Sequence, residues 1–343
     1  MIIHNRLLLQ FHITGRCNLK CKHCYRTQGD VENLSFDDIK NVIEQFLILL
    51  KKYNSIYSMK KRGHINITGG EPFMRKDIKA VLKLLHSHKD EFSFGILSNG
   101  SFIDNDMVAV LKETEVSFVQ LSIDGDKGTH DYLRKAGDYD RVFNTAQYLE
   151  KNGIKTYISF TANAENFTHI PLVAKECRKR NITKLWSDRI VPIGNGENFK
   201  DIAITPELLP KYIAVMKEAQ GNIITKLLHR KTQVTLNRAL QFIDSDGCHY
   251  SCSAGDSLIT VDEFGNVMPC RRMPIICGNV FADTLENIYF NHDTFVDLRQ
   301  SIIPNECLAC EYMFLCKGGA KCQSYAKYGT YKKADPACPV LSK

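Results

Sequence analysis

No stretch of this chain approaches the roughly 20 consecutive apolar residues that a membrane-spanning helix requires, so the sequence predicts no membrane segment. Residues 1–6 hold a short apolar run that charge interrupts, which is not the pattern of a secretory signal peptide. An arm of clustered basic residues is also missing, because the net charge is only +7 and most Lys and Arg residues are interspersed with acids. Nucleic acid is therefore not an expected partner. Together these absences predict a globular cytoplasmic protein.

The residue type in excess is cysteine, with 13 among 343 residues. In a small secreted domain such a number would indicate disulfides, but a cytoplasmic protein keeps its thiols reduced. Closely spaced reduced thiols indicate metal or iron–sulfur binding. The distribution is uneven, since three cysteines lie within residues 17–24 and nine lie from Cys248 onward.

Segments of strand character alternate with segments of helix character over the first 190 residues, at intervals of roughly 30 residues. The predicted strands are 7–13, 64–67, 93–98, 117–123, 155–161 and 184–191. The predicted helices are 35–52, 75–88, 104–113, 140–151 and 167–180. This alternation is typical of parallel βα units in an α/β fold. Six units do not close an eight-stranded barrel, so we expect a partial (β/α)6 TIM-like barrel, with a doubly wound sheet as the alternative; either fold places ligands at the carboxyl ends of its strands.

The character of the sequence changes after the barrel segment, which we place at residues 1–196. Residues 197–247 have the pattern of a helical connector. Residues 248–343 are rich in cysteine and glycine, and the pattern predicts few regular elements there. Bound metal clusters would supply the cross-links that such a segment lacks, so we expect a small cysteine-rich iron–sulfur domain.

Three cysteines directly follow the first predicted strand: Cys17, Cys21 and Cys24. Three thiolates can bind three irons of a cubane cluster and leave the fourth iron without a protein ligand. Such an open position lets a cofactor or substrate bind the metal, which a closed structural site does not allow. A zinc knuckle is the alternative, but zinc usually takes four ligands and His23, between two cysteines, is poorly placed for one. The loop therefore favours an iron–sulfur cluster.

The Cys-x3-Cys-x2-Cys spacing of this loop resembles that of the radical S-adenosylmethionine superfamily. Further motifs resemble the family in the same order, each after a predicted strand: Thr68-Gly69-Gly70-Glu71-Pro72, Ser98-Asn99-Gly100 and Ser122-Ile123-Asp124-Gly125. The resemblance covers roughly residues 5–195. It implies a 4Fe–4S cluster on the three cysteines, at which S-adenosylmethionine is cleaved reductively to a 5′-deoxyadenosyl radical.

The same resemblance implies which residues contact S-adenosylmethionine. The glycine-rich turn would meet its amino group, and Ser122 with Arg134 would hold its carboxylate, with Arg141 as an alternative to Arg134. Residues at the end of the fifth strand would reach the ribose, and the turn at Ile193 would lie near the adenine. The predicted contacts are Gly69, Gly70, Glu71, Ser98, Asn99, Ser122, Asp124, Arg134, Ser159, Thr161 and Ile193.

The cysteines of the last hundred residues resemble those of the SPASM extension, which binds two auxiliary 4Fe–4S clusters. This resemblance implies a first set of ligands, Cys252, Cys270 and Cys322, with Cys248 as the fourth. It implies a second set, Cys307, Cys310, Cys316 and Cys338. One departure concerns Cys322, because five residues separate it from Cys316 where the family usually has three. Zinc ribbons are the alternative for the whole segment. Cys177 is expected to be a structural thiol, and Cys277 to be either packing or a reserve ligand.

Enzymes with this extension mostly act on peptides or proteins, so the resemblance favours a maturase that forms a thioether or another cross-link on a ribosomal peptide. The alternatives are an anaerobic sulfatase maturase, a tetrapyrrole enzyme of the heme-pathway type, and a non-enzymatic electron carrier. Sulfatase maturases carry an Asp that acts as a base just after the second auxiliary cysteine. This chain has Arg271 there, followed by Arg272, and a guanidinium cannot take a proton. These arginines are expected either to meet a carboxylate-rich substrate or to lie in a solvated turn.

The expected partners follow from the same resemblance. The electron donor would be a flavodoxin- or ferredoxin-type protein. The cysteine loop is reached by residue 17, which leaves no room before it for a peptide-binding domain. A peptide substrate would then need a separate recognition adaptor or would dock directly on the barrel.

Overall fold

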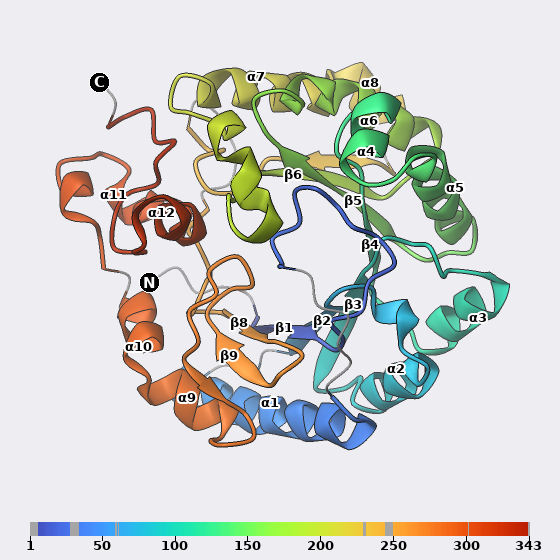
Figure 1. The fold of residues 1–343 in the computed structure, drawn as a ribbon, viewed down its shortest axis with the longest axis vertical. Helices are drawn as coiled ribbons and strands as arrows, with labels where there is room; N and C mark the ends of the chain where they lie inside the picture. Colours follow the sequence, from blue (N-terminus) through green and yellow to red (C-terminus); the bar gives the residue numbers. More distant parts are fainter. Residues whose placement is uncertain are drawn as a thin grey trace.

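The computed structural model describes residues 6–27, 34–58, 60, 62–228, 231–243, 250–300 and 302–341. Its strands form one 10-stranded sheet in the order β10-β9-β8-β1-β2-β3-β4-β5-β6-β7. The six central strands run parallel, and helices surround them on the outside (Figure 1). The sheet curves without closing on itself, so the predicted partial (β/α)6 barrel is confirmed.

The predicted barrel elements are all present. The central strands are β1 (Leu8–His12), β2 (Gly63–Thr68), β3 (Phe92–Leu97), β4 (Val119–Ser122), β5 (Thr156–Ala162) and β6 (Lys184–Arg189). The helices between them are α1 (Phe36–Ile56), α2 (Ile78–Ser87), α3 (Asn105–Glu113), α4 (Lys127–Leu133), α5 (Asp138–Lys151) and α6 (Ile170–Lys179). Helix α4 was not expected. It is too short for a clear apolar period, but Asp126 caps it by accepting from the Thr129 amide at 2.8 Å.

The remaining elements extend the sheet at both edges. They are α7 (Leu209–Gln220), α8 (Ile223–Leu228), β7 (Gln233–Thr235), β8 (Leu258–Val261), β9 (Asn266–Met268), β10 (Gly278–Asn279), α9 (Leu285–Asn291), α10 (Asp293–Gln300), α11 (Met313–Cys316) and α12 (Lys321–Tyr328). Short 3-10 helices cover Pro72–Met74, Phe167–His169, Gly194–Ile202 and Asn305–Cys307. Among the described residues, no helix combines the length and the apolar character needed to cross a membrane.

The expectation of few regular elements after Cys248 is wrong. Strand β8 pairs in parallel with β1, in register from Leu8 beside Leu258 to Phe11 beside Val261. All four residues of β8 are buried. The cysteine-rich segment thus completes the edge of the barrel sheet, and a run of four residues is too short to be read from periodicity.

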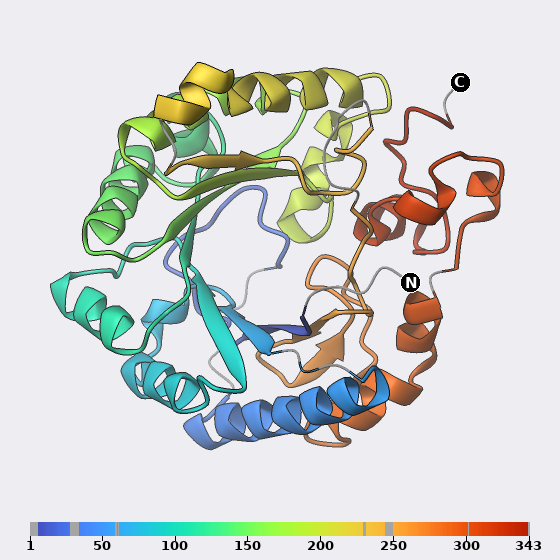
Figure 2. The same cartoon turned by 180° about the vertical axis from the view of Figure 1, so that it is seen from behind.

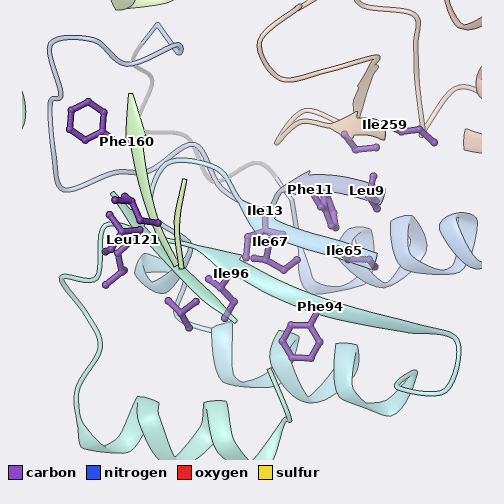
Figure 3. Close-up of a cluster of buried hydrophobic side chains, with 14 of the residues drawn as sticks. Leu9, Phe11, Ile13, Ile65, Ile67, Phe94, Ile96, Leu121, Phe160 and Ile259 are labelled. Atoms are coloured by element: carbon purple, nitrogen blue, oxygen red, sulfur yellow. The ribbon is translucent and has the colours of Figure 1, made fainter. Parts of the chain in front are cut away.

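Apolar side chains of the strands form the core behind the site. Leu9, Phe11 and Ile13 lie with Ile65 and Ile67 in one continuous cluster of buried side chains (Figure 3). Strand β8 adds Ile259 to the same cluster. Burial of these apolar side chains fixes which faces of the strands point away from the core. It thereby fixes where the polar residues of the strands can meet.

Helix α1 joins the two halves of the chain. A capping box begins it, because the Ser35 hydroxyl accepts from the Asp38 amide at 3.1 Å and the Asp38 carboxylate accepts from the Ser35 amide at 2.8 Å. Farther along, the Gln45 side chain donates to the Val280 carbonyl at 3.0 Å and accepts from the Leu285 amide at 2.8 Å. Helix α9 therefore lies beside α1, as seen from behind in Figure 2.

Candidate functional site

A cavity of about 470 Å³ lies at the carboxyl ends of the central strands. This is the position that an α/β barrel predicts for ligands. The loop after β1, which carries the three N-terminal cysteines, passes across the middle of the ring of helices (Figure 1). Predicted site residues that line the cavity are Cys17, Cys21, Cys24, Gly69, Gly70, Ser98, Asn99, Ser122, Arg134, Ser159 and Thr161.

The glycine-rich turn after β2 holds the cysteine loop in place. The Gly70 amide donates to the Thr14 carbonyl at 2.9 Å, and the Glu71 amide donates to the Arg16 carbonyl at 2.7 Å. A Cβ on Gly69 would lie 2.2 Å from the Thr14 oxygen, and one on Gly70 would lie 2.1 Å from the Arg16 oxygen. Gly69 also has φ +137°. Only glycine allows this close approach, so these two residues both line the cavity and position the thiols.

Glu71 does not line the cavity. Its carboxylate is fully buried and accepts from the Ser98 hydroxyl at 2.8 Å, from the Asn99 amide at 2.7 Å and from the Phe73 amide at 3.2 Å. Burial raises the pKa of Glu71 to about 7, although these hydrogen bonds oppose the shift. The structure therefore gives Glu71 a clear role in joining the turns after β2 and β3.

Arg134 reaches the cysteine loop from the end of α4. Its Nε donates to Asp124 Oδ2 at 2.6 Å, and its Nη1 lies 3.7 Å from the sulfur of Cys21. Asp124 is buried behind it, accepts from the Thr161 amide at 3.0 Å and lies 3.2 Å from His23 Nε2. Burial alone would raise the pKa of Asp124, but Arg134 and His23 hold it well below its usual range. Asp124 is thus an ionised anchor for Arg134 rather than a residue of the cavity wall.

Of the other predicted contacts to S-adenosylmethionine, Ser122 and Ser159 line the cavity and Ile193 does not. The hydroxyl oxygens of Ser122, at the end of β4, and Ser159, in the middle of β5, lie 3.1 Å apart and line the cavity. Ile193 is absent from the wall in the part of the chain that the structure describes. It packs against the apolar cluster of the cysteine-rich segment, and Val191 lines the cavity instead. The Ile193 amide donates to the Val191 carbonyl at 2.8 Å, a tight turn that carries Ile193 away from the cavity.

Sequence reasoning missed a group of cavity-lining residues on β6. Trp186 and Asp188 project into the cavity from β6, two positions apart and hence on one face of the strand. Trp186 donates to the Gln120 side chain at 3.2 Å, and Asp188 accepts from Arg272 at 2.7 Å. The signal that could have identified them is a large polar or aromatic residue at alternate positions of a strand that is otherwise buried.

The structure brings the four cysteines of the second auxiliary set together. Its members line one small cavity of about 20 Å³ beside α11: Cys307, Cys310, Cys316 and Cys338. Burial raises the pKa of the Cys307 thiol to about 11 and that of Cys316 to about 12. Neutral thiols are inexpensive to bury, whereas thiolates at these positions need a metal to balance their charge. The four residues therefore fit a cluster.

Cysteines of the first auxiliary set also lie close together. Burial raises the pKa of the Cys322 thiol. The nearby Cys270 and Cys252 raise this pKa further through electrostatic repulsion between the thiolates. The longer spacing before Cys322 therefore does not remove it from the set. The predicted fourth ligand, Cys248, lies outside the described residues. Cys277 packs in the main core and donates to the Ile275 carbonyl at 3.4 Å, so it is a structural thiol there.

No group of three His, Cys, Asp or Glu side chains in the described ranges is arranged to hold a single metal ion. The thiols of each set nevertheless line one cavity or lie close enough to interact electrostatically. A cubane cluster spaces its thiolates more widely than a single ion does, because each thiolate binds a different iron.

Comparison with known proteins agrees with this geometry. The model of the radical SAM superfamily matches residues 11–177, and that of the SPASM iron–sulfur cluster-binding domain matches residues 242–311. Fe-coproporphyrin III synthase of Methanosarcina barkeri is 25% identical over 96% of this chain and 86% of the relative. Mycofactocin maturase MftC of Mycolicibacterium smegmatis is 24% identical over 97% of this chain and 82% of the relative. Among solved structures, Streptococcus suis SuiB bound to S-adenosylmethionine shares the fold, with a TM-score of 0.75 and 18% identity over 97% of this chain and 77% of SuiB.

Proposed function

This chain belongs to the radical S-adenosylmethionine superfamily and carries a C-terminal SPASM domain, and from that starting point we propose that it is a maturase which modifies a peptide by forming a thioether or another cross-link. The observation that carries the proposal is the size of the cavity. Its volume of about 470 Å³ is at the lower end of the usual range for small-molecule sites, and S-adenosylmethionine must share it with the substrate. A protruding side chain of a peptide fits that remaining space, whereas a bulky substrate enters only by an edge.

We propose that Cys17, Cys21 and Cys24 hold a 4Fe–4S cluster, and that the two auxiliary sets hold two more. When bound, the cluster on these three cysteines would supply the electron and the open iron position needed to cleave S-adenosylmethionine reductively. The residues of the chain orient the reactants. Arg134, held by Asp124, presents its guanidinium to the methionyl carboxylate, and the hydroxyls of Ser122 and Ser159 offer hydrogen bonds beside it.

We further propose a flavodoxin- or ferredoxin-type protein as the electron donor. A peptide substrate would be recognised through a separate adaptor or by docking on the barrel. Both proposals rest on the resemblance in sequence.

A tetrapyrrole substrate is the second candidate. It is favoured by the relatives that align over 96% of this chain and are named Fe-coproporphyrin III synthase and AdoMet-dependent heme synthase. Its carboxylate-bearing edge would have to face the part of the cavity where Arg271 and Arg272 lie. A sulfatase maturase is less well supported, because arginine stands where those enzymes carry a base.

The first test is reconstitution without oxygen, followed by reduction and addition of S-adenosylmethionine. We expect roughly twelve irons per chain, four for each cubane, and formation of 5′-deoxyadenosine. Changing Cys17, Cys21 and Cys24 together to Ala should abolish 5′-deoxyadenosine formation while about eight irons remain. Unchanged 5′-deoxyadenosine in that variant, or stoichiometric zinc without iron, would contradict the assignment. Mass analysis after incubation with cysteine-containing peptides or with Fe-coproporphyrin III then distinguishes the two substrates.

A further inference from the structure

Five arginines line the cavity, and their charges are balanced unequally. Four of these guanidinium groups each contact a carboxylate of the chain: Arg26 with Glu263, Arg134 with Asp124 at 2.6 Å, Arg189 with Asp335 at 2.6 Å, and Arg272 with Asp188 at 2.7 Å. Arg271 is the exception, because no carboxylate of the described residues pairs with it. The arginines of the cavity wall therefore carry one positive charge more than the carboxylates paired with them neutralise.

The surroundings of Arg271 orient its guanidinium without satisfying it. The group lies 5.3 Å from the centre of the Tyr25 ring, in a cation–π contact. The Nε of Arg271 is buried and has no hydrogen-bond partner among the described residues. A buried donor without a partner is costly, and the cost disappears when a ligand supplies an acceptor.

We propose that Arg271 binds a carboxylate of the substrate in this cavity. The planar guanidinium can donate two parallel hydrogen bonds to such a group, which fixes both its position and its orientation. An acidic side chain of a peptide and an aliphatic acid arm of a tetrapyrrole present the same chemistry. The inference rests on the proposed function, since it assumes that the substrate enters the cavity where S-adenosylmethionine binds.

Two neighbouring arginines do not take this role. Arg134 lies against Cys21 on the cysteine loop, which suits the carboxylate of S-adenosylmethionine. Arg272, next to Arg271 in sequence, is already held by Asp188. Arg271 is therefore the arginine on this wall that is left for a second carboxylate, and substrates that lack one should bind poorly.

The test is ligand binding to the reconstituted protein in the presence of S-adenosylmethionine. Trp186 is the single tryptophan of the chain and lines the cavity, so its fluorescence reports occupancy independently of turnover. Two pairs of probes are used: Fe-coproporphyrin III with its tetramethyl ester, and a glutamate-rich peptide with its glutamine counterpart. We expect the wild type to bind the acid of at least one pair about tenfold or more tightly than its neutral partner. The pair that shows the preference identifies the source of the carboxylate.

Arg271→Gln should abolish that preference and leave the affinity for S-adenosylmethionine within about twofold, while Arg271→Lys should keep part of the preference. Arg6→Gln is the matched control, because Arg6 is exposed before the amino end of β1, at the opposite end of the barrel. A preference retained in Arg271→Gln overturns the inference, as does equal binding of acid and neutral probes by the wild type. Formation of 5′-deoxyadenosine without substrate is measured in parallel; its absence from the wild type would defeat the proposed function instead.

Discussion

Replacing Asp335 by Ala should loosen the attachment of the C-terminal cysteines to the barrel. Asp335 is buried, and its two carboxylate oxygens accept from Arg189 Nη1 and Nη2 at 2.8 and 2.6 Å. The same carboxylate accepts from the amides of Ala320 and Ala337 at 2.9 and 3.1 Å. Arg189 ends strand β6, so this one side chain ties the barrel to the segment that carries Cys322 and Cys338.

The expected magnitude follows from leaving Arg189 charged, buried and unpaired. Removing one partner of such a buried pair costs about 3–5 kcal/mol. Unfolding entropy is about 2.1 cal/mol/K per residue, which for 343 residues gives about 0.7 kcal/mol/K if the chain unfolds as one unit. Dividing the two predicts that the midpoint of thermal unfolding falls by about 4–7 °C.

Thermal unfolding of the reconstituted protein without oxygen measures this shift. The double variant Arg189→Met/Asp335→Leu should recover most of the loss, because apolar side chains replace both charges. Lys83→Met is the control: it breaks an exposed ion pair with Glu113, which contributes little. A fall of less than about 1 °C in Asp335→Ala, or a double variant less stable than the single one, would refute the reasoning.

Three further changes test other parts of the site. Gly70→Ala should displace the cysteine loop, because the new Cβ would lie 2.1 Å from the Arg16 oxygen, and should weaken S-adenosylmethionine binding about tenfold or more in a calorimetric titration. The control Gly128→Ala should bind S-adenosylmethionine normally, because the nearest atom to its Cβ would be 3.8 Å away. Folding raises the pKa of Glu71 from 4.5 to about 7, so the folded protein holds this proton more tightly than the unfolded chain and its stability should fall as pH rises between these values. In Glu71→Gln the urea unfolding midpoint should no longer fall with pH over this range, and an unchanged pH dependence would contradict the pKa shift. Lys321 is buried near Cys252 of one auxiliary set and Cys307 of the other, so its positive charge stabilises the reduced form of both clusters. Lys321→Met should lower both reduction potentials in a redox titration followed by electron paramagnetic resonance, whereas Lys327→Met, at an exposed position of the same helix, should not.

Local patterns were enough to predict the barrel and the ligand classes. The βα alternation of residues 7–191 specified six parallel units, because each strand carries its own apolar run and each helix its own period. The spacing of Cys17, Cys21 and Cys24, and the polar residues at successive strand ends, are local as well. Parallel strands bring their carboxyl ends to one edge, so these residues had to converge.

Other features depend on contacts between segments far apart in the chain, and these only the tertiary structure decided. The pairing of β8 with β1 joins residues about 250 positions apart, and a four-residue buried strand carries no periodic signal. The sequence placed Arg271 beside Arg272 and could not separate their roles. In the fold, Asp188 of β6 neutralises Arg272, while Arg271 faces the ring of Tyr25. The sequence thus determined which chemical groups are present. Packing determined which of their charges remain unpaired, because a charge is neutralised by its neighbours in space.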